Sequence, residues 1–518
     1  MKCHVNIFLI AVVAAFGFSG TPNVDYDRAG LIAIRLINPE TIKSSLVFLA
    51  SDSLQGRETT EPGQRMAASF ISSKFKSLGL KPLGDDGTYL QHFDVNVHYI
   101  SDSSCLSVNG MNFWYNKDMT IMPFGAADTV VNRSIVFAGF GFESDSYSDY
   151  GNIDASNKIV MILSGNPRFA DSTDIFVKSE LYKRTNAMKH GAAAVIIAVQ
   201  GGEKSFTELR RKSNSFFGAK TMSLATREAA AAKGMQVVMI DESAANSLLA
   251  DLHQTVTQIS RRIDSTGSPS AFDLTNGRIS VIIKSEMRVT ENVVGAIEGS
   301  DPALRDQYVV YSAHYDHLGK TADGLIFHGA DDNASGTSTV LGIAEAYAKS
   351  AVKPRRSIIF LTVTGEEKGL LGSSYFVAHP VVPLKSIAAD LNTDMDGRID
   401  SVHFNTDSNY VYVIGSRKIS YHLDSLMIAA DSASEKMTLE YTYDSDNDPN
   451  QFYYRSDQYN FAKNKIPIIF FFSGDHPDYH KPTDTSDKID YPVLARRASL
   501  IFLTGWKVAN FESGLRPN

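Results

Sequence analysis

The sequence predicts an α/β fold, in which a mixed, mostly parallel β-sheet carries helices on both faces and is interrupted by an inserted β-rich domain. After residue 286 the chain alternates apolar strands, polar loops and helical segments, which is typical of sheets covered by helices on both sides. Between residues 116 and 285 short β-rich runs replace that alternation. We therefore divide the chain into a discontinuous domain, residues 21–115 and 286–518, and an insertion, residues 116–285.

Composition describes an ordinary globular protein. The chain has 518 residues, which at about 150 residues per domain suggests several domains. Hydrophobic residues make up 43% and charged residues 21%, which excludes a disordered chain and a polytopic membrane protein. The net charge of −8 comes with scattered basic pairs and no basic stripe, so we expect no nucleic-acid partner.

The first residues have the pattern of a secretory signal peptide. Lys2 precedes an apolar run at residues 7–16, and small residues follow it. The run is too short for a membrane span, which needs ~20 residues. We predict a signal peptide at residues 1–20, a secreted or periplasmic protein without a stable membrane span, and no lipid attachment, since no cysteine follows the run. The alternative is a retained N-terminal anchor. Removal of the peptide leaves Cys105 as the only cysteine.

Local patterns predict the individual elements in chain order. Pro62 near a first turn, apolar residues at helical spacing and a terminating Gly79 predict a helix between them. In the insertion we expect strands at residues 134–138, 158–163 and 191–198 and a helix at residues 178–190. After the insertion we expect strands at residues 308–313, 357–363, 386–391 and 466–472, and helices at residues 336–349, 368–376 and 491–510.

Histidine and carboxylate residues stand just past the ends of these last strands. They are His314, Asp316, Asp331, Asp332, Glu366, Glu367, Asp394 and His480. Ligands of α/β sheets bind outside the carboxyl ends of the strands, so we expect these side chains to converge there. Converging buried carboxylates repel one another and would be forced to protonate, unless a multivalent cation binds among them.

The donor types favour zinc. Imidazole and carboxylate without thiolate favour zinc over iron–sulfur clusters, and over calcium or magnesium, which prefer oxygen ligands alone. Two histidines and at least three carboxylates suit two ions better than one, and two-metal hydrolytic sites hold their ions ~3.5–4 Å apart. The sequence contains neither a His-Glu-x-x-His motif nor a Gly-x-Ser-x-Gly elbow.

Five segments, in this order, resemble the secreted co-catalytic zinc peptidases of the aminopeptidase and glutamate carboxypeptidase family. The segments are residues 312–316, 329–336, 364–373, 391–395 and 476–480. The resemblance extends upstream to Leu54-Gln55-Gly56-Arg57, and the insertion resembles the protease-associated domain that many members carry. It implies a zinc exopeptidase-like fold, two Zn²⁺ ions per chain and peptide substrates.

The resemblance also implies a role for each site residue. Asp332 matches the carboxylate that bridges both zinc ions. His314 and Asp394 match the remaining ligands of one ion, and Glu367 and His480 match those of the other.

Three further roles follow from the same resemblance. Glu366 matches the general base that takes a proton from the attacking water, and Asp316 matches a carboxylate that orients His314. A tyrosine that stabilises the developing oxyanion is expected at Tyr453 by its offset from the Ser-Asp motif, with Tyr454 as the alternative.

Several neighbouring positions need separate comment. Asp331 is expected to be a neighbour of the site and not a ligand, and relatives often hold a cis peptide where this chain has Asp332-Asn333. Two residues depart from the family pattern. Gln458 replaces a histidine, which leaves the tuning of the site and the recognition of the substrate end in doubt. Asp396 replaces an apolar residue, and we favour a solvated charge there over an added acceptor behind the ligands.

The sequence therefore predicts a zinc-dependent exopeptidase, with an aminopeptidase favoured. The alternative is a glutamate carboxypeptidase-like enzyme, which should place arginines to hold a substrate carboxylate. A glutaminyl cyclase with one zinc, and an inactive binding or receptor protein of the same fold, are disfavoured because the whole ligand set is retained.

Overall fold

The computed structural model describes residues 24–122, 128–170, 180–216, 220–225, 235–321 and 324–518. The predicted signal peptide, residues 1–20, lies outside these ranges, so export to the periplasm or the medium stays a prediction. Among the described helices, none combines the length and apolar character needed to cross a membrane.

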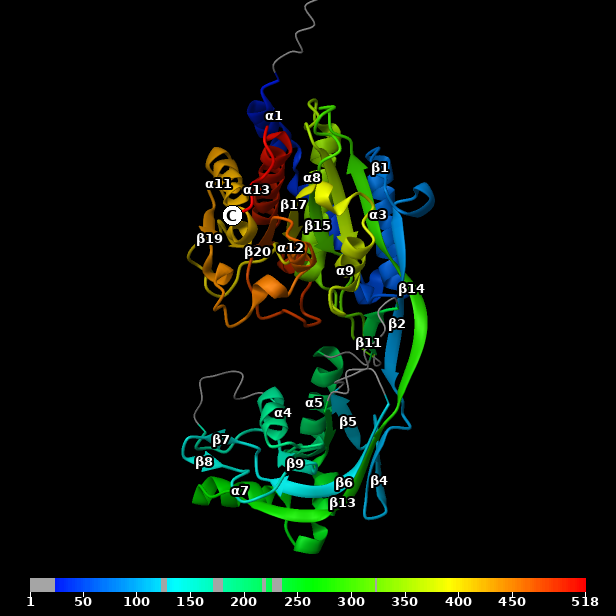
Figure 1. Cartoon of the computed structure of the whole chain (residues 1–518), viewed down its shortest axis with the longest axis vertical. Helices are drawn as coiled ribbons and strands as arrows, with labels where there is room; N and C mark the ends of the chain where they lie inside the picture. The colour runs from blue at the N-terminus through cyan, green and yellow to red at the C-terminus, as the bar shows by residue number, and fades with distance from the viewer. Residues whose placement is uncertain (1–23, 123–127, 171–179, 217–219, 226–234, 322–323) are drawn as a thin grey trace, which may run out of the picture.

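Two β-sheets form two lobes, and one pair of long strands joins them (Figure 1). Strands β2 (Leu90–Ile100) and β14 (Ile283–Ile297) pair in antiparallel fashion along their length, from Ile283 opposite Ile100 to Val293 opposite Leu90. The chain leaves the first lobe along β2 and returns along β14, so the insertion is held by two strands of the first sheet.

The first sheet has a parallel centre and antiparallel edges. Its order is β11-β2-β14-β16-β15-β17-β20-β18-β19, with β1 beside β14. The four strands from β16 to β20 pair in parallel, whereas β14, β2 and β11 on one side and β18 on the other are antiparallel to their inner neighbours. The bounds are β1 (Lys81–Pro82), β11 (Lys220–Leu224), β15 (Tyr308–His314), β16 (Ser357–Val363), β17 (Ile387–Thr393), β18 (Tyr410–Ile414), β19 (Thr438–Glu440) and β20 (Ile468–Phe472).

Helices cover both faces of this sheet, which confirms the predicted fold class. One face packs against α1 (Tyr26–Ala33), α2 (Pro39–Leu49), α3 (Pro62–Ser77), α8 (Gly336–Lys349), α11 (Tyr421–Ala433) and α13 (Tyr491–Asn510). The other face packs against α9 (Leu371–Ala378) and α12 (Gln458–Lys463). A short helix, α10 (Ser416–Ile419), follows β18.

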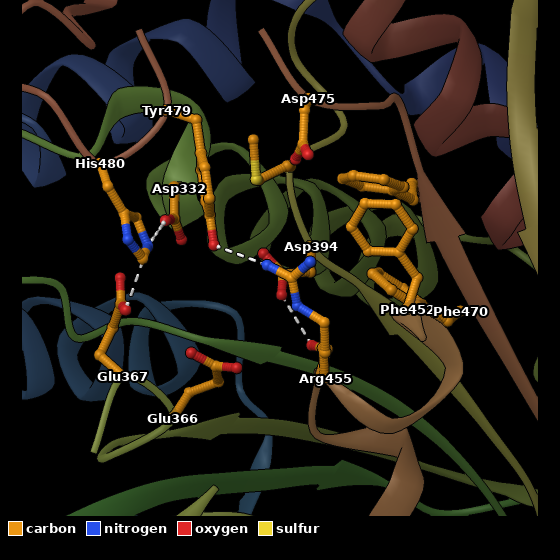
Figure 2. Close-up of a pocket in the computed structure, with 13 residues that line it drawn as sticks. Asp332, Glu366, Glu367, Asp394, Phe452, Arg455, Phe470, Asp475, Tyr479 and His480 are labelled. Carbon is orange, nitrogen blue, oxygen red and sulfur yellow. Dashed lines mark hydrogen bonds and ion pairs between the residues drawn. The ribbon is translucent and has the colours of Figure 1, made fainter. Parts of the chain in front are cut away.

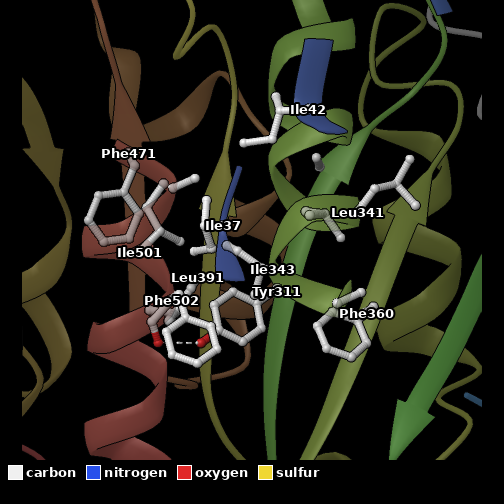
Figure 3. Close-up of a cluster of buried hydrophobic side chains, with 14 of the residues drawn as sticks. Ile37, Ile42, Tyr311, Leu341, Ile343, Phe360, Leu391, Phe471, Ile501 and Phe502 are labelled. Carbon is white, nitrogen blue, oxygen red and sulfur yellow. Dashed lines mark hydrogen bonds between the residues drawn. The ribbon is translucent and has the colours of Figure 1, made fainter. Parts of the chain in front are cut away.

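A continuous apolar core joins the helices of the first face to the central strands (Figure 3). Tyr311 of β15 is fully buried there, and its hydroxyl donates a 2.9 Å hydrogen bond to the carbonyl of Phe502 in α13. Gly505 makes this close approach possible, because a Cβ at that position would lie 2.0 Å from the Tyr311 hydroxyl oxygen. The core thereby fixes the strand whose last residue is His314.

The predicted elements of this lobe agree with the structure, with one shifted start. The helices expected at residues 336–349 and 491–510 are α8 and α13, and the helix expected after Pro62 is α3. The helix expected at residues 368–376 begins instead at Leu371. Residues 366–370 form a turn first, in which the backbone N–H groups of Gly369 and Leu370 donate to the carbonyl of Glu366.

The second sheet contains most of the predicted insertion. Its order is β4-β3-β13-β6-β9-β10-β12-β5, and the bounds are β3 (Cys105–Val108), β4 (Met111–Trp114), β5 (Met119–Met122), β6 (Thr129–Ala138), β9 (Ile159–Leu163), β10 (Ala194–Ala198), β12 (Gln236–Ile240) and β13 (Ala271–Val281). Helices lie on both of its faces: α4 (Glu180–Lys189) and α5 (Gly202–Phe216) on one, and α6 (Glu242–Leu248) and α7 (Val256–Thr266) on the other. A small hairpin pairs β7 (Glu143–Ser144) with β8 (Tyr147–Ser148).

The boundary of the insertion differs from the expected one at residue 116. The second sheet already begins at Cys105, because β3 and β4 form a hairpin that pairs with β13. Strand β11, from within the expected insertion, pairs with β2 at the edge of the first sheet. The likeness of this lobe to a protease-associated domain stays a prediction.

A buried arginine ties the upstream motif to the loops that follow β15. Arg57 is 1% exposed, and its guanidinium donates to four backbone carbonyls, those of Leu49, Tyr315, His328 and Gly329, at 2.5–2.9 Å. Its own carbonyl accepts a hydrogen bond from the N–H of His317. The motif around Arg57 thus holds the segment that follows His314 and the segment that precedes Asp332.

We predict that Arg57→Met lowers the free energy of unfolding by about 3 kcal/mol or more, because it removes four hydrogen bonds from a buried guanidinium to backbone carbonyls around the site. Denaturant unfolding followed by circular dichroism measures this. Arg35→Met changes an exposed arginine and should leave the midpoint unchanged. Equal midpoints for both variants would show that Arg57 does not hold these loops.

Candidate metal centre

Most of the predicted site residues meet at the carboxyl edge of the first sheet. Figure 2 shows Asp332, Glu366, Glu367, Asp394 and His480 around one pocket. His314 is the last residue of β15, and Glu366 and Glu367 follow β16. Asp394 follows β17 directly, and Asp332 precedes α8. His480 comes from the loop after β20. Parallel strands therefore deliver these side chains to one place.

The first group of donors consists of His314, Asp332 and Asp394. The Nε2 atom of His314 lies 3.2 Å from Oδ1 of Asp394 and 3.4 Å from Oδ1 of Asp332. One donor atom from each residue lies within 4.8 Å of the others, and all three residues are buried. This arrangement leaves space for one metal ion between them.

The second group shares Asp332 with the first. The Nε2 atom of His480 lies 3.1 Å from Oδ2 of Asp332 and 3.3 Å from Oε2 of Glu367. A further histidine, His317, approaches the same carboxylates, with its Nδ1 atom 2.8 Å from Oε1 of Glu367 and 3.7 Å from Oδ2 of Asp332. The two oxygens of Asp332 thus face two different groups of donors.

The donors fit divalent metal ions. Imidazole nitrogens and carboxylate oxygens are the ligands that zinc takes in the absence of thiolates. Oε1 of Glu367 is buried and has no hydrogen-bond partner among the described residues, a cost that a bound cation removes. The cluster is therefore compatible with metal binding, as the sequence predicted.

Asp316 lies behind His314, as expected. The Nδ1 atom of His314 faces the Asp316 carbonyl oxygen at 3.2 Å and the Oδ1 atom at 3.7 Å. Asp316 is itself fixed, because its carboxylate accepts from the hydroxyl of Thr59 at 2.8 Å and from the N–H of Glu366 at 3.3 Å. With Nδ1 turned toward Asp316, Nε2 of His314 is directed at the ligand carboxylates.

Charges within the site shift the titration of its groups. Burial raises the pKa of Glu366 well above its ordinary value, and the carboxylates of Glu367 and Asp394 raise it further. Burial acts against a charge on His480, yet Glu367 and Asp332 raise its pKa to about 11. His480 and His317 hold the pKa of Glu367 well below its usual range in spite of burial. Glu366 and Glu367, although adjacent, thus have opposite environments.

Asp331 faces away from the donors, as predicted. Its Oδ2 atom lies 3.2 Å from Nε2 of His476, and its Oδ1 atom accepts from the N–H of Gly397 at 2.7 Å. The N–H groups of Asp331 and Asp332 both donate to the carboxylate of Asp484. The bond between Asp332 and Asn333 is cis, as the family resemblance implied.

A buried polar network supports Asp394 from behind. The hydroxyl of Ser456 donates to Oδ2 of Asp394 at 2.7 Å. The amide of Asn392 donates to Ser456 and to Oε1 of Gln458, each at 3.0 Å. Gln458 therefore replaces the family's histidine as a neutral acceptor within this network, and Asn392 and Ser456 lie between it and Asp394.

The expectation of a solvated Asp396 is wrong. Asp396 is fully buried, and its carboxylate accepts from the hydroxyl of Thr339 at 2.9 Å. Burial raises the pKa of Asp396 to about 6. The turn after β17 packs under α8, a contact between distant segments that the local sequence pattern does not reveal.

Tyr453 is not placed where the oxyanion role requires it. The pocket beside the donors is lined by Tyr479 and not by Tyr453 or Tyr454. The short 3₁₀ turn Phe452–Tyr454 directs Phe452 into the pocket, whereas the Tyr453 ring packs near Gly415. Burial raises the pKa of Tyr479 well above its ordinary value, and Asp332 and Glu367 raise it further.

Beside the donors the pocket is lined by the aromatic rings of Phe452 and Phe470 (Figure 2), and also by Phe472. Its volume is about 170 Å³. Two charged residues also line it. Arg455 donates to the hydroxyl of Tyr479 at 3.3 Å and stacks 4.8 Å from the Phe452 ring centre, and Asp475 completes the lining.

Sequence reasoning missed three charged or titratable residues of this region. His317 and Arg455 are described above. Asp457 is fully buried, accepts from the hydroxyl of Ser373 at 2.5 Å, and has its pKa raised to about 7 by burial. His317 follows His314 closely and Arg455 precedes the Ser-Asp motif, so proximity to these motifs was the available signal.

Comparison with known families gives one match. Residues 292–504 match the model of peptidase family M28. This range contains all five predicted ligands, and the family resemblance drawn from the motifs is confirmed over it.

Known proteins resemble the chain over part or most of its length. Aminopeptidase NAALADL1 of Mus musculus is 36% identical over 23% of this chain and 15% of its own length. A probable glutamate carboxypeptidase of Arabidopsis thaliana is 30% identical over 44% of this chain and 32% of its own length. The chain thus spans a minor part of these curated relatives. The structure of a zinc aminopeptidase from Bacillus subtilis shares the fold, with a TM-score of 0.57 and 19% identity over 92% of this chain and 97% of that one.

Proposed function

We propose that the protein is a metal-dependent exopeptidase that binds two divalent ions and removes N-terminal residues from peptides. The observation that carries the proposal is the sharing of Asp332 by two groups of buried donors, because a bridging carboxylate between two sites is the arrangement of two-metal hydrolases. When bound, such ions supply a nucleophilic water at neutral pH and polarise the substrate carbonyl.

Glu366 is the proposed general base. It lines the pocket, and its Oε2 atom lies 3.8 Å from Nε2 of His314, so it faces the space between the donors and the substrate. The hydrogen bond from its N–H to Asp316 fixes the backbone that carries it. A carboxylate whose pKa lies above its ordinary value is better matched to accepting a proton near neutral pH.

The pocket supports an aminopeptidase. Its volume of about 170 Å³ lies below the ~300–1,000 Å³ of typical ligand pockets, so it suits one side chain, and aromatic residues close it. Asp394, Glu366 and Asp475 line the same pocket and are suited to hold a free α-ammonium group. The mouse relative is named an aminopeptidase, which agrees with this assignment.

One observation favours the alternative, a C-terminal exopeptidase. Arg455 lines the pocket, and within the described structure its guanidinium makes a single hydrogen bond, to Tyr479, which leaves other guanidinium donors for a substrate carboxylate. The plant relative is named a probable glutamate carboxypeptidase. Asp475 lines the same pocket, where burial raises its pKa and the charge of Arg455 acts in the opposite direction. This nearby carboxyl partly offsets the charge of Arg455, and we favour the aminopeptidase.

We predict two zinc ions per chain after equilibration with zinc and removal of free metal, measured by mass spectrometry. Asp332→Ala should lose both ions because both groups of donors need that residue, whereas Asp394→Ala should lose one. Less than one zinc in the unaltered protein would contradict the metal assignment.

We predict that Glu366→Gln retains both ions and lowers kcat by roughly 10²–10⁴-fold, the usual contribution of a general base. Steady-state hydrolysis of an aminoacyl p-nitroanilide measures the effect. Glu298→Gln alters a 60%-exposed carboxylate outside the site and serves as the control. Undiminished turnover in the Glu366 variant would remove it as the base.

We predict that N-acetylation of dipeptide substrates abolishes hydrolysis and that C-terminal amidation does not. The free α-ammonium is the group that the pocket carboxylates would hold. Arg455→Ala should then change KM little, as should Arg278→Ala, which alters an exposed arginine in the other lobe. Hydrolysis that survives N-acetylation, fails on amides and weakens in the Arg455 variant would establish the carboxypeptidase instead.

A further inference from the structure

His317 has no role in the predicted ligand set, yet it is one of the most enclosed residues of the site. It lies three positions beyond His314, and its side chain is 0% exposed. Neither ring nitrogen has a hydrogen-bond partner among the residues that the structure describes. A buried imidazole whose two nitrogens make no hydrogen bond is costly, so its position next to two carboxylates needs an explanation.

The ring is directed at the second group of donors. Nδ1 of His317 lies 2.8 Å from Oε1 of Glu367, but the pair does not have hydrogen-bond geometry, and that oxygen is also without a partner in the described part of the chain. Nδ1 of His317, an oxygen of Asp332 and an oxygen of Glu367 all lie within 4.8 Å of one another. Donor atoms that converge without bonding each other are arranged for a shared cation.

The backbone holds the ring in this position. Gly329 has a φ of +55°, and a Cβ there would lie 2.5 Å from Cγ and Cδ2 of the His317 ring. Only glycine leaves room for the imidazole against this turn. On the other side of the site, the His480 ring lies 5.9 Å from the His317 ring, centre to centre, in an edge-on arrangement. Two imidazoles thus flank the Asp332 and Glu367 carboxylates.

We propose that His317 is a fourth protein ligand of the metal ion held by Asp332, Glu367 and His480, in addition to the five ligands taken from the family. The inference rests on the proposed two-metal function. It makes the two sites unequal, because His314, Asp332 and Asp394 give the other ion only three protein donors.

This inequality has a chemical consequence. Zinc sites with four protein ligands are closed and structural, whereas catalytic sites keep three protein ligands and an open position. The ion beside His317 is therefore the tightly held one, which fixes Asp332 and Glu367. The ion beside His314 exchanges more readily and keeps the open position.

Metal titration tests the assignment. Protein stripped by a chelator is titrated with Co²⁺, and binding is followed by d–d absorption and calorimetry. We expect two unequal affinities in the unaltered protein. His317→Ala should weaken the tighter Co²⁺ affinity by more than roughly 10–100-fold, which is the loss expected when a residue that only hydrogen-bonds a ligand is removed. It should also change the absorption spectrum of the first Co²⁺ ion bound. His98→Ala removes a buried histidine of β2, hydrogen-bonded to Ser285 and Ser223, and should leave both affinities unchanged.

X-ray absorption of the unaltered protein loaded with one equivalent of zinc gives a second test that does not depend on the folding of a variant. Two imidazoles around that ion are expected. One imidazole, or a His317→Ala variant with unchanged affinities and spectrum, would overturn the assignment while leaving the two-metal site in place. Failure of the unaltered protein to bind any ion would instead overturn the proposed function itself.

Discussion

The mutual repulsion of buried carboxylates is the constraint on which the rest of this lobe depends. Asp332, Glu366, Glu367 and Asp394 line one pocket of about 170 Å³, with Asp316 and Asp457 buried behind them. In a medium of low dielectric, carboxylates this close together either become protonated or are stabilised by neighbouring positive charges. The opposite pKa shifts of Glu366 and Glu367 show both responses side by side. Burial and nearby carboxylates raise the pKa of Glu366 in spite of His314, whereas His480 and His317 lower that of Glu367 in spite of burial.

The surrounding residues Arg57 and Asp484 hold the carboxylates together by hydrogen-bonding the backbone of the loops that carry them, and not by forming ion pairs with them. Among the described residues, the guanidinium of Arg57 donates to four backbone carbonyls around the site and to no carboxylate. Asp484 accepts the N–H groups of Asp331 and Asp332 and so fixes the turn that precedes α8. Loops bound in this way cannot relax to separate the carboxylates, so their charge is offset where they stand, by protonation, by the neighbouring histidines or by a bound cation.

The sequence predicted the parts of this arrangement that depend on local order. A predicted ligand stands within four residues of the end of each of the parallel strands β15, β16 and β17, so strand ends and ligands could be recognised together. The pairing of β2 with β14 could not, because almost the whole second lobe separates them in the chain. Tyr453 was misplaced because its offset from the Ser-Asp motif does not reveal which side of the 3₁₀ turn faces the pocket. His317 was missed because it faces Asp332 and Glu367, which come from other segments of the chain. Arg455 was missed because its contact with Tyr479 depends on a loop distant in sequence.

The second lobe reaches the site through one short strand. Lys220 of β11 lies 2.6 Å from Glu61 and 3.4 Å from Glu58, and the other oxygen of Glu58 lies 3.2 Å from Nζ of Lys368, which directly follows Glu367. These side chains are mostly buried, with Lys368 6% exposed, so the pairs are less screened than surface ion pairs. Ion pairs therefore connect edge strand β11 to the loop that carries Glu366 and Glu367. Through them the insertion contributes to the position of that loop.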